Sequence, residues 1–306
     1  MSLQGSHLGV EQMCELGRVS RAGYYRNLQI QAPKEEETAI RGEIQKIAVA
    51  HKRRYGVRRV AKQLRDQGMI VNRKRVARIM REDNLLAIRY RKFVPTTDSS
   101  HRHKVYWNLA KRMTLTGINQ LWVADITYIR LREEFVYLAV VLDAYSRKVI
   151  GWALERNMQV HLTVSALRQA LEQRRPPANV VHHSDQGSQY ACPEYVQILL
   201  ENEMIPSMSR AGCPYDNAAC ESFMKTLKQE EIYASEYRNL EDLRTHLQEF
   251  LNDYYNRVRL HSALGYRSPD AFEATLPVDR HAQAATFEFS EALEIYRSDM
   301  GVKSNE

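Results

Sequence analysis

The chain has 306 residues, of which 44% are hydrophobic, and a formal net charge of +7. This length allows a sizeable core and two or three domains, and the basic balance indicates a polyanionic partner. The longest apolar run is too short to span a membrane. The four cysteines follow no zinc or disulfide spacing, and the N-terminus lacks a signal-peptide pattern. We therefore expect a cytoplasmic protein with reduced thiols.

The positive charge is concentrated in one segment. Residues 41–92 hold 17 Lys and Arg against 4 Asp and Glu, so this segment carries +13 and the rest of the chain −6. Apolar residues at helical spacing predict a helix over 35–50, a second that begins near Val57 and ends at Gly68, and a third over 73–83 that Asn72 caps. Residues 1–34 form a further helical segment, either a solvated hairpin or part of a helix-turn-helix.

Two short amphipathic helices around a glycine-containing turn are typical of a helix-turn-helix domain, here expected over residues 35–92. A run of charges can be a solvated helix face. Here the run has one sign, and like charges at helical spacing repel one another, so we expect DNA binding. The candidate DNA-binding side chains are Arg58, Arg59, Arg73, Lys74, Arg75 and Arg78.

Residues 93–119 are polar and weakly patterned, and we interpret them as a linker. From residue 120 the pattern predicts strands over about 121–130, 135–143, 148–154, 179–183 and 205–208, and helices over 160–173, 193–203, 217–232 and 240–255. Three consecutive strands followed by alternating helices and strands indicate an α/β domain, a mixed five-stranded sheet with flanking helices, over residues 120–275. Residues 276–306 form a tail with little pattern.

Three acids stand out in this second domain. Asp125 lies among apolar and aromatic residues of the first strand, where an unpaired carboxylate is costly. Asp185 follows the end of a later strand, where α/β sheets tend to place their sites. Glu221 lies on a helix behind a Gly/Pro/Asn loop. Carboxylate oxygens suit hard cations, and Mg²⁺ often takes one or two of them. Each acid alone could be a surface or cap residue, so the hypothesis depends on the three together.

Several segments identify a known family. LWVADITYI, VVLDAYSRKVIGWA, HHSDQGSQY, SMSRAGCPYDNAACESFMKTLK and YNRVRLHSALGYRSPDAF resemble bacterial insertion-sequence transposases of the second-reading-frame type in the IS three family. YGVRRVAKQLRDQGMIVNRKRVARIM is similar to the family's helix-turn-helix. The resemblance runs from about residue 10 to about residue 275. Between Asp185 and Glu221 lie 35 residues, the spacing of the family's DDE signature.

The resemblance implies an RNase H-like integrase core in which Asp125, Asp185 and Glu221 bind two Mg²⁺ or Mn²⁺ ions and catalyse DNA cleavage and 3′-hydroxyl strand transfer. It also implies that Lys228 contacts the terminal DNA, although an exposed helix lysine is the alternative. The implied substrates are the element's terminal inverted repeats and a target DNA. The implied partners are further copies of the chain on paired ends and the first-reading-frame protein, in the bacterial nucleoid and away from any membrane.

Two other functions remain open: an RNase H-type nuclease without strand transfer, and a DNA-binding regulator with an inactive core. Among neighbouring residues, we interpret Asp143 as a turn former outside the triad. For His182 and His183 we expect one packed ring and one that faces DNA. Asp216 and Asn217 are expected to cap the helix that carries Glu221.

Overall fold

The computed structural model describes residues 9–28, 35–87, 104–210 and 217–277. The chain divides into two compact units, residues 1–87 and 88–306, and each is described by itself. The end of the predicted helix-turn-helix domain and the first part of the predicted linker (88–103), the Gly/Pro/Asn loop (211–216) and most of the tail (278–306) lie outside the described residues.

The first unit is helical. Its helices are α1 (Val10–Leu16), α2 (Arg21–Leu28), α3 (Glu35–Ala50), α4 (Val57–Asp66) and α5 (Arg73–Glu82). Asn72 Oδ1 accepts a hydrogen bond from the Lys74 N–H at 2.8 Å, which confirms the predicted cap. Gly68 ends the turn after α4 with φ +86°, a conformation that favours glycine. Helices α3, α4 and α5 share a core in which Ile44, Val60 and Val76 are fully buried.

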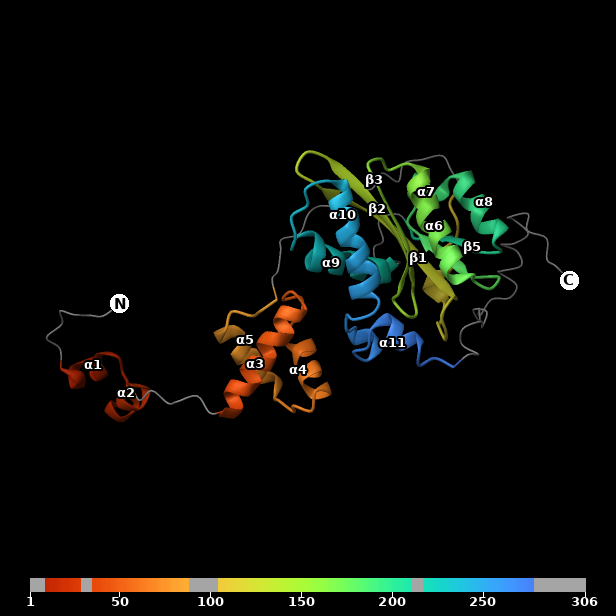
Figure 1. Ribbon diagram of the computed structural model, residues 1–306. Helices are drawn as coiled ribbons and strands as arrows, with labels where there is room; N and C mark the ends of the chain where they lie inside the picture. Colours follow the sequence, from red (N-terminus) through yellow and green to blue (C-terminus); the bar gives the residue numbers. More distant parts are fainter. Residues whose placement is uncertain (1–8, 29–34, 88–103, 211–216, 278–306) are drawn as a thin grey trace. The chain divides into compact units, whose positions relative to one another are not determined.

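The second unit contains the mixed five-stranded sheet that the sequence predicts (Figure 1). Its strands are β1 (Leu121–Arg130), β2 (Phe135–Asp143), β3 (Val149–Glu155), β4 (Val181–Ser184) and β5 (Ile205–Met208). The order across the sheet is β3-β2-β1-β4-β5. The β3-β2-β1 part is antiparallel, and β4 and β5 join it in parallel. β-branched and aromatic residues make up about half of β1 and β2, and such side chains pack well on a pleated surface.

Helices surround this sheet (Figure 1). They are α6 (Val160–Arg174), α7 (Ser188–Ala191), α8 (Pro193–Glu201), α9 (Ala218–Leu227), α10 (Leu240–Gln248) and α11 (Pro269–Glu273), with short 3-10 turns at Ala110–Arg112 and Ser262–Leu264. The predicted helices over 217–232 and 240–255 each change into a π-helix, at Lys228–Ile232 and Glu249–Tyr255. Within the described ranges, no helix is both long enough and apolar enough to cross a bilayer.

Two contacts hold the outer strand β3 in place. A Cβ at Gly151 would lie 2.2 Å from the Ala166 carbonyl oxygen, so only glycine allows α6 to approach this closely. On the other side, Asn256 pairs with Val149 as a strand would. Its Oδ1 accepts from the Val149 N–H at 3.0 Å, and its Nδ2 donates to the Val149 carbonyl at 2.9 Å.

The described part of the segment expected as a linker, residues 104–119, packs against β5. The Leu109 N–H donates to Ser207 Oγ at 2.9 Å, and Tyr106 is buried in the core of the second unit. Apolar residues too sparse to show a period can still anchor a segment, which explains why this part of the sequence resembled a linker.

Candidate active site

The strand that carries Asp125 extends beyond its parallel neighbour. β4 pairs with β1 at Leu121–Val123, and the register ends there. The next polar backbone groups on that edge are the Ala124 carbonyl and the Ile126 N–H, because alternate residues of a strand point to the same side. Asn217 Nδ2 donates to the Ala124 carbonyl at 3.0 Å. The Ile126 N–H donates to Asp125 Oδ1 at 2.9 Å. Along this part of β1, side chains therefore make the backbone hydrogen bonds that a neighbouring strand would otherwise make.

Asp125 lies among other charged groups. Burial, with the nearby negative charges of Asp185 and Glu221, raises the pKa of its carboxyl to about 7. The Ile126 N–H and the positive charge of Lys228 act in the opposite direction. The four charged side chains predicted for this site therefore interact around one strand, and the fold compensates the Asp125 charge only in part.

Asp185 is aimed by a tight turn after β4. Its Oδ1 accepts the Gly187 N–H at 2.9 Å, and Ser184 Oγ donates to the Asp185 carbonyl oxygen at 3.0 Å. A Cβ at Gly187 would lie 2.9 Å from the same Oδ1 and would displace the carboxylate. Ser184 and Gly187 therefore shape the turn.

Glu221 lies in the first turn of α9 and is exposed. The buried side chains Cys220 and Phe223 anchor this helix, which packs against β1. Over the described ranges, no three His, Cys, Asp or Glu side chains lie close enough together to hold a metal ion as they stand. The chemistry of the acids still fits a hard cation, since Mg²⁺ is commonly held by one or two carboxylates together with water and phosphate oxygens.

Lys228 marks the change from α9 to the following π-helix, a distortion frequently found at functional sites. Its ammonium lies 5.3 Å from the centre of the Tyr128 ring. Burial lowers the pKa of Lys228, and the negative charge of Asp125 partly offsets that shift. Lys228 is therefore half-buried beside the acids, unlike a lysine on a solvated helix face.

Asp143 is fully buried and is satisfied by the backbone. Its Oδ2 accepts from the Asn119 N–H at 2.7 Å, and its Oδ1 accepts from the N–H groups of Tyr145 and Ser146 at 3.0 and 2.9 Å. The Arg147 N–H closes the turn on the Asp143 carbonyl at 2.8 Å. The structural role expected for Asp143 is confirmed.

Two expectations about residues near Asp185 and Glu221 are wrong, and the first concerns His182 and His183. Both histidines are buried: His182 Nε2 lies 3.0 Å from the Tyr195 hydroxyl, and the two ring nitrogens of His183 lie 2.8 and 3.0 Å from the hydroxyls of Ser207 and Ser209. Burial lowers the pKa of His182 to about 3.

Asn217 is the second correction. It precedes α9, but its side chain makes no capping hydrogen bond and binds β1 instead. Asp216 lies outside the described residues.

In the first unit, acids lie between the candidate DNA-binding cations. Arg75 NH1 lies 2.7 Å from Glu36, and Arg78 forms ion pairs with Glu37 at 3.2 Å and with Glu82 at 2.9 Å. The inference that these charges repel one another and need an external anion is therefore wrong for Arg75 and Arg78. Glu36 and Glu37 of α3, far away in sequence, and Glu82 of α5 supply the counter-charges.

The other four candidates differ in their surroundings. The Arg59 guanidinium lies 5.6 Å from the Tyr55 ring centre. Arg58, Arg73 and Lys74 are exposed. Arg73 and Lys74 also begin α5, where the helix dipole favours an anion.

Comparisons with known proteins agree with this architecture. Residues 34–93 match an HTH-like domain, and residues 116–214 and 202–269 match two models of an integrase core domain. A 31 kDa protein of insertion element IS600 from Shigella sonnei is 39% identical over 263 residues, which are 85% of this chain and 97% of that protein. The transposase InsF of insertion sequence IS3A from Escherichia coli strain K12 is 37% identical over 273 residues, 88% of this chain and 95% of InsF.

Among solved structures, the catalytic core domain of HTLV-2 integrase in complex with magnesium matches 53% of this chain and 100% of its own length, with 15% identity and a TM-score of 0.40. That likeness is too distant to bear on chemistry. The matches to the curated relatives extend over nearly the whole length of those relatives, and they agree with the domain matches. The chain belongs to the family of insertion-sequence transposases that includes InsF, with an HTH-like domain followed by an integrase core domain.

Proposed function

We propose that this transposase cleaves DNA at the ends of an insertion sequence and joins the freed 3′ ends to a target, with Asp125, Asp185 and Glu221 as the catalytic acids. One observation supports this assignment most directly. Asp185 and Glu221 come from different elements, yet both raise the pKa of Asp125, which the fold leaves with a single backbone hydrogen bond.

The reaction consists of two displacements at phosphorus. In the first, a water oxygen attacks the phosphodiester at the element's end, and the bond from phosphorus to the 3′ oxygen breaks. The products are a 3′-hydroxyl and a 5′-phosphate. In the second, that 3′ oxygen attacks a target phosphodiester, and the target's own 3′ oxygen leaves with a proton. One phosphodiester bond forms as another breaks, so the joining step needs no external energy source.

The chemistry of the three acids also supports a proposal for the cofactor. A divalent cation, Mg²⁺ or Mn²⁺ and two per site, would activate the attacking oxygen and stabilise the leaving one. Asp125 and Asp185 would hold it together with Glu221. Because Asp125 Oδ1 already accepts the Ile126 N–H, its Oδ2 keeps full capacity for a cation. Lys228, half-buried beside Asp125, would contact a phosphate of the terminal DNA.

The HTH-like domain supplies the second part of the proposal. Arg58, Arg73 and Lys74 would bind DNA phosphates. Arg75 and Arg78 would approach the DNA from within their ion pairs, and Arg59 from beside the Tyr55 ring. The ends of the element are the proposed specific substrate. At least two copies of the chain would act on paired ends in the bacterial cytoplasm, with the first-reading-frame protein as a further partner.

The test is a joining assay with a labelled, pre-cut element end and a target plasmid. We expect joining with Mg²⁺ or Mn²⁺, none with Ca²⁺, and none with Glu221→Gln. The matched control is Glu194→Gln, because Glu194 is also an exposed glutamate in the first turn of a helix of the same unit. This control should join as the wild type does.

Other outcomes would favour the alternatives. Cutting without joining would indicate a nuclease without strand transfer. DNA binding without any chemistry, even after the first-reading-frame protein is added, would indicate a regulator with an inactive core and would overturn the proposal.

A further inference from the structure

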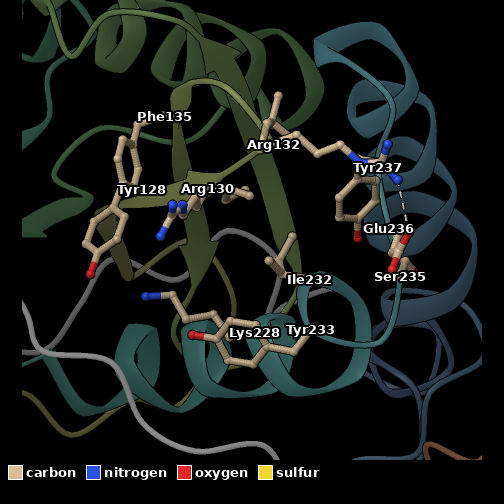
Figure 2. A pocket seen from close by; sticks show the side chains of 12 residues that line it. Tyr128, Arg130, Arg132, Phe135, Lys228, Ile232, Tyr233, Ser235, Glu236 and Tyr237 are labelled. Atoms are coloured by element: carbon tan, nitrogen blue, oxygen red, sulfur yellow. Dashed lines mark hydrogen bonds and ion pairs between the residues drawn. The ribbon is translucent and has the colours of Figure 1, made fainter.

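A pocket opens beside Lys228, on the side of the integrase core where the β1–β2 hairpin meets the end of α9 (Figure 2). Its volume is about 440 Å³, within the range of roughly 300–1,000 Å³ typical of sites for small molecules. Aromatic rings and cations dominate its lining. Its main members are Tyr128, Arg130, Phe135, Lys228, Tyr233 and Tyr237.

The hairpin contributes an exposed aromatic side chain and an exposed cation to the wall of this pocket. Phe135 is 51% exposed, and Arg130 beside it is exposed as well. The rings of Tyr128 and Phe135 meet edge to face at 6.0 Å, and the Arg130 guanidinium lies 5.9 Å from the Phe135 ring centre. An exposed aromatic residue flanked by a cation contributes little to the core. It presents both a stacking surface and a positive charge to a ligand.

The pocket is also connected to the acids. The Lys228 ammonium lies 5.3 Å from the centre of the Tyr128 ring, on the strand that also carries Asp125, and Lys228 directly follows α9, which carries Glu221. One side chain therefore borders both the pocket and the carboxylate site. Figure 2 shows Lys228 and Tyr233 below the hairpin residues, with Arg130 extending from the hairpin between Tyr128 and Ile232.

We propose that this pocket receives one unpaired nucleotide of the DNA next to the reacting phosphodiester. The inference rests on the proposed function, because it assumes that the DNA passes over Asp125, Asp185 and Glu221. Aromatic faces stack on any base, and this binding tolerates all sequences because every base has a π-face. Arg130 and Lys228 supply charge for the phosphate of the same nucleotide. An ordinary paired base inside a duplex could not enter, since both of its faces are already stacked.

The far rim limits what else could bind. Arg132, in the turn of the hairpin, forms an ion pair with Glu236 at 3.3 Å, so the rim around this pair is close to neutral and the positive charge is concentrated near Lys228. This asymmetry fits a ligand with an aromatic end and one anionic group. An extended acidic peptide would need positive charge on both rims.

The experiment compares affinities in Ca²⁺. The probes are a labelled duplex of the element end and the same duplex in which a mismatch unpairs the nucleotide beside the transferred 3′ end. A second pair places the mismatch in a target duplex. We expect the wild type to prefer a mismatched probe, and Phe135→Ala to reduce that preference by about 10-fold while its affinity for paired duplex stays unchanged.

Two further variants separate this effect from misfolding. Arg130→Gln should reduce the preference less, because it keeps the side-chain stem and loses only the charge. Val258→Ala removes part of a side chain that is 47% exposed and outside the pocket, and it should behave as the wild type does. A preference that depends on Phe135 in either pair supports the pocket, and the responding pair identifies the strand.

The joining assay on the same preparations keeps the two proposals distinguishable. If the wild type joins DNA but shows no preference, or a preference that Phe135→Ala leaves intact, the pocket proposal is overturned and the transposase chemistry stands. If the preference depends on Phe135 but no joining occurs, the pocket stands and the chemistry fails.

Discussion

Asp125 and Asp143 lie on the two strands of one hairpin, and the fold treats them differently. Asp143 is fully buried and accepts three backbone N–H groups. Asp125 accepts one and has the charges of Asp185 and Glu221 nearby. Asp125 is also only half-buried, so hydrogen-bond satisfaction and burial together separate an acid that serves the fold from an acid that remains available to a ligand. The following experiments test that distinction.

The largest effect should come from Asp125→Asn. We expect joining to fall by at least about 10³-fold, as for other residues that act directly in catalysis. The fold should persist, because the amide oxygen still accepts the Ile126 N–H and the buried charge disappears. Joining kinetics and circular dichroism on the same sample measure the two parts. An unfolded Asp125→Asn protein would show that Asp125 is structural.

Asp143→Ala should have the opposite profile. The substitution leaves three backbone N–H groups without their acceptor, which costs roughly 3 kcal/mol of unfolding free energy. Denaturant titration measures that loss. The folded fraction should retain its joining activity per folded molecule, and a complete loss of joining in well-folded Asp143→Ala would contradict the distinction.

Gly187→Ala tests positioning without removing any acid. The added methyl group would meet Asp185 Oδ1 at 2.9 Å, and a side-chain end can move at small cost to stability. We expect joining to fall by about 10- to 100-fold, as for the loss of groups that orient metal ligands. The melting temperature should change little. Gly42→Ala is the control, because a Cβ there meets nothing within 4 Å.

The stability of the metal-free protein should depend on pH because of Asp125. Its pKa of about 7 lies above the ordinary value of 3.8, so between these values the folded chain keeps a proton that the unfolded chain has released. Stability should fall as the pH rises from 4 to 7 and then level off. In EDTA, Asp125→Asn should melt a few degrees higher than the wild type at pH 8.

Adding Mg²⁺ provides the complementary measurement. A cation that binds only the folded protein stabilises it, so the wild type should regain melting temperature at pH 8 and Asp125→Asn should not. Equal responses of the two proteins would show that the cation binds elsewhere.

The same distinction extends to the cations of the first unit, where the effect should be smallest. Arg73→Gln with Lys74→Gln should reduce the salt dependence of DNA binding by roughly two phosphate contacts. Arg75→Gln with Arg78→Gln breaks ion pairs to Glu36, Glu37 and Glu82 and should mainly lower stability. Binding titrations at several salt concentrations, with thermal melts, compare the two double variants. Equal salt slopes for both would remove the distinction.

Local pattern predicted much of this fold. Strands β1, β2 and β5 begin and end at the residues predicted for them, and α3 follows its isoleucine spacing. The switches to π-helix at Lys228 and Glu249 were not predictable, because one extra residue in a helical turn leaves the apolar period almost unchanged. The short helix α7 was missed for lack of a period.

The candidate site was predictable in identity but not in geometry. The three acids could be selected from their contexts and from the family's spacing. The burial of both histidines depends on Ser207 of β5, on Ser209 just after it and on Tyr195 of α8, which no local pattern connects to the histidines. Likewise, the link from Asn217 to β1 joins positions 93 residues apart. Contacts of this range are set by tertiary packing.

The part of β1 beyond β4 carries a further consequence, for solubility. A strand edge with unsatisfied backbone groups is a template for pairing with another chain, and proteins usually cover or charge such edges. Here Asp125 places a carboxylate on that edge, and Asn217, with α9, occupies it. Asp125 and Asn217 thus also protect the strand edge from pairing with another chain. A variant that removes both side chains should therefore aggregate more readily as well as lose activity.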